Sequence, residues 1–240
     1  MTQTAFTDRT LRRLILQALL APLVIILMLF LLAGRWDYWQ GWVWVFLILV
    51  SELLMGTVLT RNRDLIEERL NPKEGMKPWD RFYFGVTTSL YLLAIGIAGL
   101  DARFGWTSPP ALAPGASVMP PVVYWAGVAV YILGQAIFLW ARYTNNFFSS
   151  VVRIQADRGQ TVCKDGPYRY VRHPGYVGGF LYTITVGLVL GSWWASIPQV
   201  LAALLLIWRT ALEDKTLQAE LPGYMEYTKE TRYRLIPGVW

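Results

Sequence analysis

The chain has 240 residues, of which 55% are hydrophobic and only 16% are charged. That charged fraction lies well below the roughly 25% of soluble domains and excludes an ordinary soluble domain in favour of a membrane protein. The net charge of +6 would suit nucleic acid, but the placement of the basic residues argues against that partner, as described below.

A single cysteine, Cys163, and a single histidine, His173, limit the available chemistry. One cysteine excludes an intrachain disulfide, and so few sulfur and imidazole ligands argue against a zinc site. Neither G-x-G-x-x-G nor G-x-x-x-x-G-K-[ST] occurs, so a Rossmann or P-loop nucleotide site is not supported. We expect no metal and no nucleic acid as partners.

Four long apolar runs are predicted to span a membrane, because each has about the 20 residues that cross a ~30 Å hydrocarbon core. They are residues 14–34, 39–60, 82–100 and 122–141. Two shorter runs, residues 176–190 and 193–208, are separated by Gly191-Ser192 and predict a tight helical hairpin. The expected fold is therefore an all-α, polytopic membrane helix bundle with four long spans plus a short C-terminal helical hairpin.

The basic residues predict the orientation of this bundle. Of the 22 Lys and Arg residues, 20 lie before the first run, between the second and third, after the fourth, or after the hairpin. By the positive-inside rule both termini are then cytosolic, in an integral, multi-pass protein that we assign to a prokaryotic inner membrane. Segment 61–81 has charges of both signs, and we interpret it as a solvated surface segment. Segment 101–121 is interpreted as an irregular connector between two spans.

Two regions follow from this pattern. Residues 1–141 are expected to form the four-span membrane bundle. Residues 142–240, including the helical hairpin 175–210, are expected to form a cytosol-facing, cofactor-binding catalytic region.

The segment from Gly166 to Gly178 carries the most chemistry, because it brings Arg172, His173 and three tyrosines between two apolar stretches. Charged groups at that depth are costly unless they bind something. Pro174 is typical of a first helical turn, where free backbone N–H groups together with Arg172 and His173 would suit an anion. Aromatic faces in the segment would suit an adenine ring or a sulfonium cation.

Two further pairs of polar residues are candidates for the site. Arg209 and Glu213 share a helix face at i and i+4, so they either pair or present one cation and one carboxylate to a zwitterionic ligand. Asn145 and Asn146 precede Phe147-Phe148 and either meet a lipid-borne acceptor or anchor the chain at the interface. Glu52, inside a predicted span, either guides a substrate, pairs with a group such as Gln135, or is protonated and structural.

The motifs resemble those of a known family. The run Arg172-His-Pro-x-Tyr-x-Gly178, preceded by Gly166-x-Tyr168, and the distal residues Arg209, Glu213, Gly223, Tyr227 and Arg234-Leu-Ile-Pro237 resemble the isoprenylcysteine carboxyl methyltransferase family. Its members are integral membrane enzymes that depend on S-adenosylmethionine. The resemblance covers roughly residues 140–237.

The resemblance implies a role for each matching position. S-adenosylmethionine would contact Gln155, Gln160, Thr161, Val162, Cys163, Tyr168, His173, Pro174, Gly175, Tyr176 and Glu213. Arg209 would be the catalytic residue and would face the carboxylate of the acceptor, and Asn145 and Asn146 would contact the acceptor. Many relatives have His where this chain has Gln160. Because a glutamine side chain can form hydrogen bonds but cannot carry a charge, a titrating role is excluded at this position.

The leading interpretation is a membrane methyltransferase whose lipophilic or small acceptor enters from the membrane lipids. A prenylcysteine-like carboxylate is the first candidate acceptor, and a phospholipid amine or a thiol are alternatives. An anionic acceptor needs no general base, so orientation and exclusion of water would supply most of the acceleration. A sterol-type reductase using NADPH and a non-enzymatic membrane scaffold are the competing interpretations.

Overall fold

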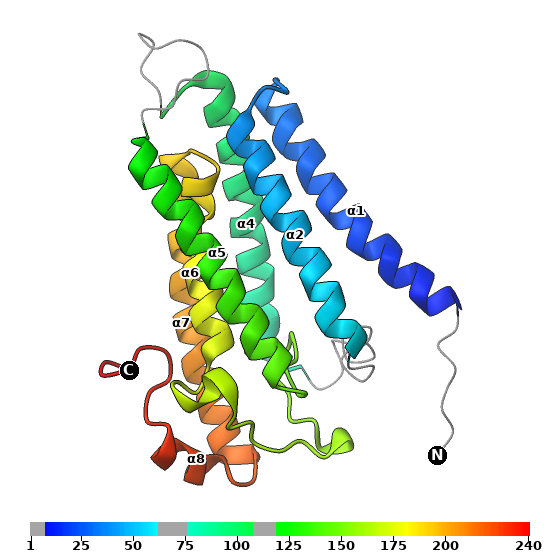
Figure 1. Ribbon diagram of the computed structural model, residues 1–240, viewed down its shortest axis with the longest axis vertical. Coiled ribbons are helices and arrows are strands. Elements are labelled where there is room, and N and C mark those ends of the chain that lie inside the picture. The colour runs from blue at the N-terminus through cyan, green and yellow to red at the C-terminus, as the bar shows by residue number, and fades with distance from the viewer. Residues whose placement is uncertain (1–7, 62–75, 108–118) are drawn as a thin grey trace.

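The computed structural model describes residues 8–61, 76–107 and 119–240, and every regular element in these ranges is a helix. The long helices pack side by side along one axis of the molecule (Figure 1). They are α1 (Asp8–Ala33), α2 (Trp39–Arg61), α4 (Pro78–Phe104), α5 (Pro121–Thr144), α6 (Pro174–Val189) and α7 (Trp193–Glu220). A short helix, α8 (Tyr224–Glu230), and two 3-10 helices, η1 (Ala156–Arg158) and η2 (Gly166–Arg169), complete the set. The expected all-α bundle is confirmed.

Four helices in the described part of the chain are long and apolar enough to cross a membrane, namely α2, α4, α5 and α7. The predicted length of the hairpin's second arm is wrong, because α7 has 28 residues. The apolar run ends at Trp208, but the helix continues through residues 209–220, whose Ala, Leu, Glu, Lys and Gln residues are strong helix formers. This polar extension carries Arg209 and Glu213 beyond the apolar part of the bundle.

Close backbone contact joins α5 to α6. A Cβ atom added to Gly134 would lie 2.7 Å from the backbone nitrogen of Tyr182 and 2.8 Å from the carbonyl oxygen of Gly178. Any side chain at Gly134 would therefore push the two helices apart. This crossing fixes the middle of α5 against the first half of α6.

The turn between α6 and α7 lies at the end of the bundle away from α8. Gly191 has a φ of 68°, and Ser192 caps α7 by accepting a hydrogen bond from the Ala195 N–H at 3.1 Å. The Ser192 hydroxyl donates to the buried carboxylate of Asp101 at 2.5 Å. Residues 101–104 belong to α4, so the predicted connector begins later than expected, and its residues 108–118 lie outside the described residues.

The opposite end of the bundle gathers η1, η2, α8 and the C-terminal segment, residues 231–240 (Figure 1); we call it the site end. The C-terminal segment turns back from α8 along the side of α6 and α7. Of the predicted solvated segment 61–81, residues 62–75 lie outside the described residues. Asp80, in the first turn of α4, is fully buried, which contradicts the solvated interpretation for this residue.

Candidate active site

The chain that leaves α5 is held in a compact loop by two glutamines. The Gln155 side chain is 1% exposed, and its Nε2 donates to the Phe147 carbonyl at 2.8 Å. The Gln155 backbone N–H donates to Gln160 Oε1 at 2.7 Å. Gln160 therefore acts here as a neutral hydrogen-bond acceptor, a role that needs no charge. The loop, residues 145–163, covers the site end.

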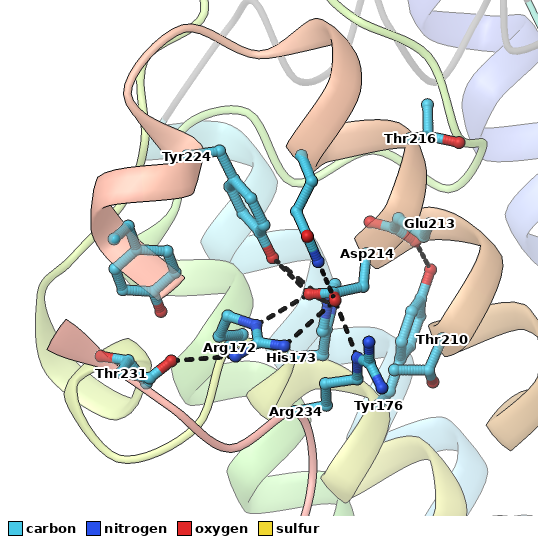
Figure 2. Close-up of polar contacts among 12 residues, drawn as sticks. Arg172, His173, Tyr176, Thr210, Glu213, Asp214, Thr216, Tyr224, Thr231 and Arg234 are labelled. Carbon is cyan, nitrogen blue, oxygen red and sulfur yellow. Dashed lines mark hydrogen bonds and ion pairs between the residues drawn. The ribbon is translucent and has the colours of Figure 1, made fainter. Parts of the chain in front are cut away.

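The start of α6 is built around Asp214, which lies on α7 and has no exposed surface. Figure 2 shows the side chains that converge on its carboxylate. Five side chains bond to it: Arg172, His173, Gln218, Tyr224 and Arg234. Arg172 binds in a fork, with Nε to Oδ1 at 2.8 Å and Nη2 to Oδ2 at 3.0 Å. The carboxylate that Arg172 and His173 bind in this structure is thus supplied by Asp214 rather than by a ligand.

The C-terminal segment takes up the backbone donors that precede α6. The Arg172 N–H donates to the Tyr233 carbonyl at 2.8 Å, and the His173 N–H donates to the Arg234 carbonyl at 3.0 Å. Arg234 also donates from Nε to Asp214 Oδ2 at 2.7 Å. The C-terminal segment therefore fixes the His173 motif in place, and these two N–H groups are not open to an anion.

Tyr176, at the start of α6, forms a hydrogen bond with Glu213 on α7. The Tyr176 hydroxyl donates to Glu213 Oε2, and the His173 and Tyr176 rings stack at 5.7 Å with an interplanar angle of 6°. The Tyr176 ring therefore lies between the His173 ring, on which it stacks, and the Glu213 carboxylate, to which its hydroxyl donates. His173, Tyr176 and Glu213, all expected near the cofactor, are brought together.

Arg209 has a partner that the sequence did not indicate. Its Nε donates to Asp80 Oδ1 at 2.7 Å, and its Nη2 donates to the Ser150 carbonyl at 2.8 Å. The Asp80 carboxylate also accepts from the Val152 N–H at 2.7 Å. The expected pairing of Arg209 with Glu213 is therefore replaced by an ion pair with α4 that also holds residues 150–152.

Three aromatic rings surround the same guanidinium. Its central carbon lies 4.8 Å from the Tyr83 ring centroid, 4.9 Å from that of Phe84 and 5.2 Å from that of Tyr176. Such contacts stabilise a cation more strongly when water is excluded. Arg209 is 6% exposed, so it is enclosed on several sides.

A first cavity, the site-end cavity, lies beneath the loop 145–163. Its lining includes ten of the eleven residues expected to contact a cofactor: Gln155, Gln160, Thr161, Val162, Cys163, Tyr168, His173, Gly175, Tyr176 and Glu213. Asn145 also lines it. Pro174, a buried residue at the first position of α6, and Asn146 are not among the lining residues that the structure describes.

A second cavity, the bundle cavity, has a volume of about 570 Å³ and lies among the long helices. Arg209 lines this cavity and not the site-end cavity. The two cavities share four lining residues, which we call the junction: Phe148, Ser149, Gly175 and Tyr176. A ligand in one cavity is thus separated from a ligand in the other only by this junction.

Burial keeps two tyrosines and the cysteine of the site-end cavity in their neutral forms. Burial raises the pKa of the Tyr168 phenol and of the Cys163 thiol above their ordinary values. Burial also raises the pKa of Tyr224, and the Asp214 carboxylate beside it adds to the effect. These three groups are therefore protonated at neutral pH and can donate hydrogen bonds. In the described residues no cluster of three His, Cys, Asp or Glu side chains could hold a metal ion.

Sequence reasoning missed two central carboxylates, Asp80 and Asp214. Asp80 follows Trp79 in a charged segment, and only its contact with α7, 129 positions later, makes it a buried partner. Asp214 was missed because the adjacent Glu213 was predicted to be the acidic residue of α7 in the site. A 3.6-residue helix period nevertheless places adjacent residues on different faces. The available signal was that period: Asp214 shares a face with Thr210 and Gln218, while Glu213 shares one with Arg209.

Comparisons with known proteins bear on this site. Residues 122–221 match the model of a family described as phospholipid methyltransferase. No curated protein sequence matches the chain.

One solved structure is described as the eukaryotic intramembrane Ras methyltransferase ICMT (isoprenylcysteine carboxyl methyltransferase). It superposes with a TM-score of 0.42 at 17% identity and covers 98% of this chain and 88% of its own. A superposition this loose supports no conclusion about the present chain.

Proposed function

Because residues 122–221, 100 of the 240, match the model of a family described as phospholipid methyltransferase, we propose that this chain is a membrane enzyme that transfers a methyl group from S-adenosylmethionine to a lipophilic acceptor. The observation that carries the proposal is the junction between the two cavities. The donor would occupy the polar site-end cavity, and the acceptor would occupy the bundle cavity. Their reacting atoms would meet at Tyr176 and Gly175.

The lining of the site-end cavity fits S-adenosylmethionine. When bound, this cofactor supplies an electrophilic methyl group on a sulfonium. Glu213 is the acidic residue in the lining and offers the charge that a sulfonium or an amino group requires, while the stacked rings of His173 and Tyr176 offer aromatic faces. The buried hydroxyl of Tyr168, which accepts from Asn145 Nδ2, still has its own proton to donate to a ribose or carboxylate oxygen.

The residues of the junction orient the reactants and exclude water. Gly175 lies against the Phe148 ring, with 2.6 Å between the ring and an added Cβ, so a side chain here would press on a ring that lines both cavities. Holding donor and acceptor in line across such a gap supplies much of the acceleration of a bimolecular transfer. A nucleophile that arrives deprotonated needs no general base, which agrees with the neutral tyrosines and thiol of the site.

We assign the acceptor first to lipophilic carboxylates of the prenylcysteine type. Two cations, Arg142 and Arg209, line the bundle cavity, and both are largely buried. A carboxylate entering from the membrane would be drawn toward them. Arg209 would then act as a positioning residue, because its Nε and Nη2 already bind Asp80 and Ser150.

A phospholipid amine is the second candidate, and one observation favours it. Asp80 offsets the charge of Arg209, so the net positive charge available to a carboxylate is smaller than the sequence suggested. Glu213, which accepts from Tyr176 of the junction, would also attract an amine. The proposed site end faces the cytosol in either case, because the basic residues of the connecting segments cluster there.

A methyl-transfer assay distinguishes these proposals. The purified full-length protein in detergent would be incubated with S-adenosylmethionine carrying a labelled methyl group and either N-acetyl-S-farnesylcysteine or phosphatidylethanolamine. Label that base releases as methanol identifies an ester, and label that stays on the lipid identifies N-methylation. Absence of S-adenosylmethionine binding in calorimetry, together with absence of transfer to both acceptors and to fractionated membrane lipids, would overturn the proposal.

A further inference from the structure

A layer of polar side chains crosses the middle of the bundle cavity. Glu52 on α2, Thr87 on α4, Gln135 on α5, Thr183 on α6 and Gln199 on α7 all line the cavity. Gln135 lies nearer the site end than Thr183, because a Cβ added to Gly178 would touch the Gly134 carbonyl and the Phe138 nitrogen on either side of Gln135. Five helices therefore contribute a polar group to this layer, which lies within the apolar part of the bundle.

Two hydrogen-bond donors that line this cavity have no partner among the described residues. They are Gln199 Nε2, on a side chain that is 1% exposed, and Trp44 Nε1, on a side chain that is 0% exposed. A buried donor without a partner costs on the order of 1–3 kcal/mol. By contrast, the hydroxyl of Thr87 is bonded to the Tyr83 carbonyl, and Gln135 Nε2 donates to the Tyr131 hydroxyl. These two donors are therefore open to an oxygen acceptor that enters the cavity.

Glu52 supplies the acceptor in this layer. It lies inside the apolar span Trp39–Val58 and is the sole acidic residue in the described lining of the bundle cavity. A charged residue at such a depth costs on the order of 2.5–3.5 kcal/mol on insertion scales and generally has a functional partner. The expected alternative partner, Gln135, instead bonds to Tyr131. Glu52 is thus available to a ligand in the cavity.

We propose that this polar layer, formed by Glu52, Thr87, Gln135, Thr183 and Gln199, is a recognition subsite for a hydroxyl group carried on the apolar portion of the methyl acceptor. A hydroxyl donates one hydrogen bond and accepts others, so it can donate to Glu52 and accept from Gln199 Nε2 at the same time. An ammonium group has no lone pair for Gln199, and a ketone has no proton for Glu52. The inference rests on the proposed function, because it deepens the specificity of the same cavity.

The geometry sets where that hydroxyl lies on the acceptor. The reacting group would lie at Tyr176, and Thr183 lies seven residues, or about 10 Å, farther along α6. A chain of about eight atoms spans this distance. The preferred acceptor is therefore an amphiphile with one polar head at the junction and a second polar group about eight atoms away from it.

Binding of two matched probes tests the subsite without requiring turnover. N-acetyl-S-(4-hydroxybutyl)cysteine and N-acetyl-S-butylcysteine differ only in the hydroxyl, which lies eight chain atoms from the carboxylate, and their dissociation constants would be measured by thermal stabilisation of the full-length protein in detergent. We expect the hydroxylated probe to bind about tenfold more tightly, as one to two hydrogen bonds in a water-poor cavity would produce. Glu52→Leu and Gln199→Leu are each expected to reduce this ratio to about twofold or less.

Two further measurements keep the test decisive. Ser89→Ala removes an exposed hydroxyl of α4 that bonds within its own helix, to the Gly85 carbonyl, and should leave the ratio at its wild-type value. Gln199→Leu should not lower the melting temperature of the free protein, because it removes a donor that has no partner. Equal binding of the two probes, or a ratio that survives both variants, would overturn the subsite. Failure of methyl transfer to either probe, with the binding ratio intact, would count against the proposed reaction and leave the subsite standing.

Discussion

Arg209 on α7 and Asp80 on α4 form a buried ion pair across 129 positions of sequence, with 2.7 Å between Nε and Oδ1. The pair also holds the segment between the two cavities, since Arg209 binds the Ser150 carbonyl and Asp80 binds the Val152 N–H. One contact therefore fixes two helices and the loop 145–163 at the same point. Its loss would disturb both halves of the site.

The first prediction concerns this pair. Asp80→Asn should lower the free energy of unfolding by about 3 kcal/mol or more, because Arg209 would remain buried without a countercharge. Thermal unfolding in detergent measures the change. Asp157→Asn breaks an exposed pair with Arg153 and is the matched control, which should leave the melting temperature unchanged. Equal melting temperatures for the two variants would show that the buried pair contributes no more than a surface one.

Tyr176→Phe tests the contact at the junction. The substitution removes the hydroxyl that donates to Glu213 while keeping the ring that stacks on His173. We expect the dissociation constant for S-adenosylmethionine to rise about tenfold, because Glu213 would lose the hydroxyl that holds its carboxylate in place at the cavity. Calorimetry provides the measurement. Tyr170→Phe, on an exposed neighbouring side chain, should leave the constant unchanged, and an equal loss in both variants would contradict the role of Tyr176.

The local part of the site could be predicted from the sequence, whereas its long-range part could not. Gln155, the run from Gln160 to Cys163 and the motif at His173 line the site-end cavity, because they belong to continuous segments whose position follows from the helices beside them. The partners of Arg172 and Arg209 could not be inferred, because Asp214 and Asp80 approach them only after α7 packs on α6 and α4. The length of α7 was also missed, since hydropathy marks where a span ends and helix propensity decides where the helix ends.

Asp214→Asn should loosen the C-terminal segment. The Asp214 carboxylate offsets the charges of Arg172 and Arg234. The same two segments are joined by backbone hydrogen bonds, from the N–H groups of residues 172 and 173 to the carbonyls of residues 233 and 234. We expect a loss on the order of 3 kcal/mol in stability and faster hydrogen exchange at the amides of 172 and 173. Glu230→Gln, which breaks the exposed pair with Lys164, is the control and should leave that exchange unchanged. Slow exchange retained in Asp214→Asn would show that the backbone bonds alone hold the segment.

Cys163 provides a reporter for occupancy of the site-end cavity, because it is the single cysteine of the chain and lines that cavity. Burial raises the pKa of its thiol. Because the thiolate is the reactive form, a raised pKa lowers its fraction at any given pH. Alkylation by iodoacetamide should therefore be slow at pH 7 and keep rising beyond about pH 8.5, where an ordinary thiol is half ionised. Saturating S-adenosylmethionine should slow the reaction severalfold by covering the thiol, whereas ATP at the same concentration should not. A rate that levels off near pH 8.5 would contradict the raised pKa, and a rate unaffected by S-adenosylmethionine would contradict its binding beside Cys163.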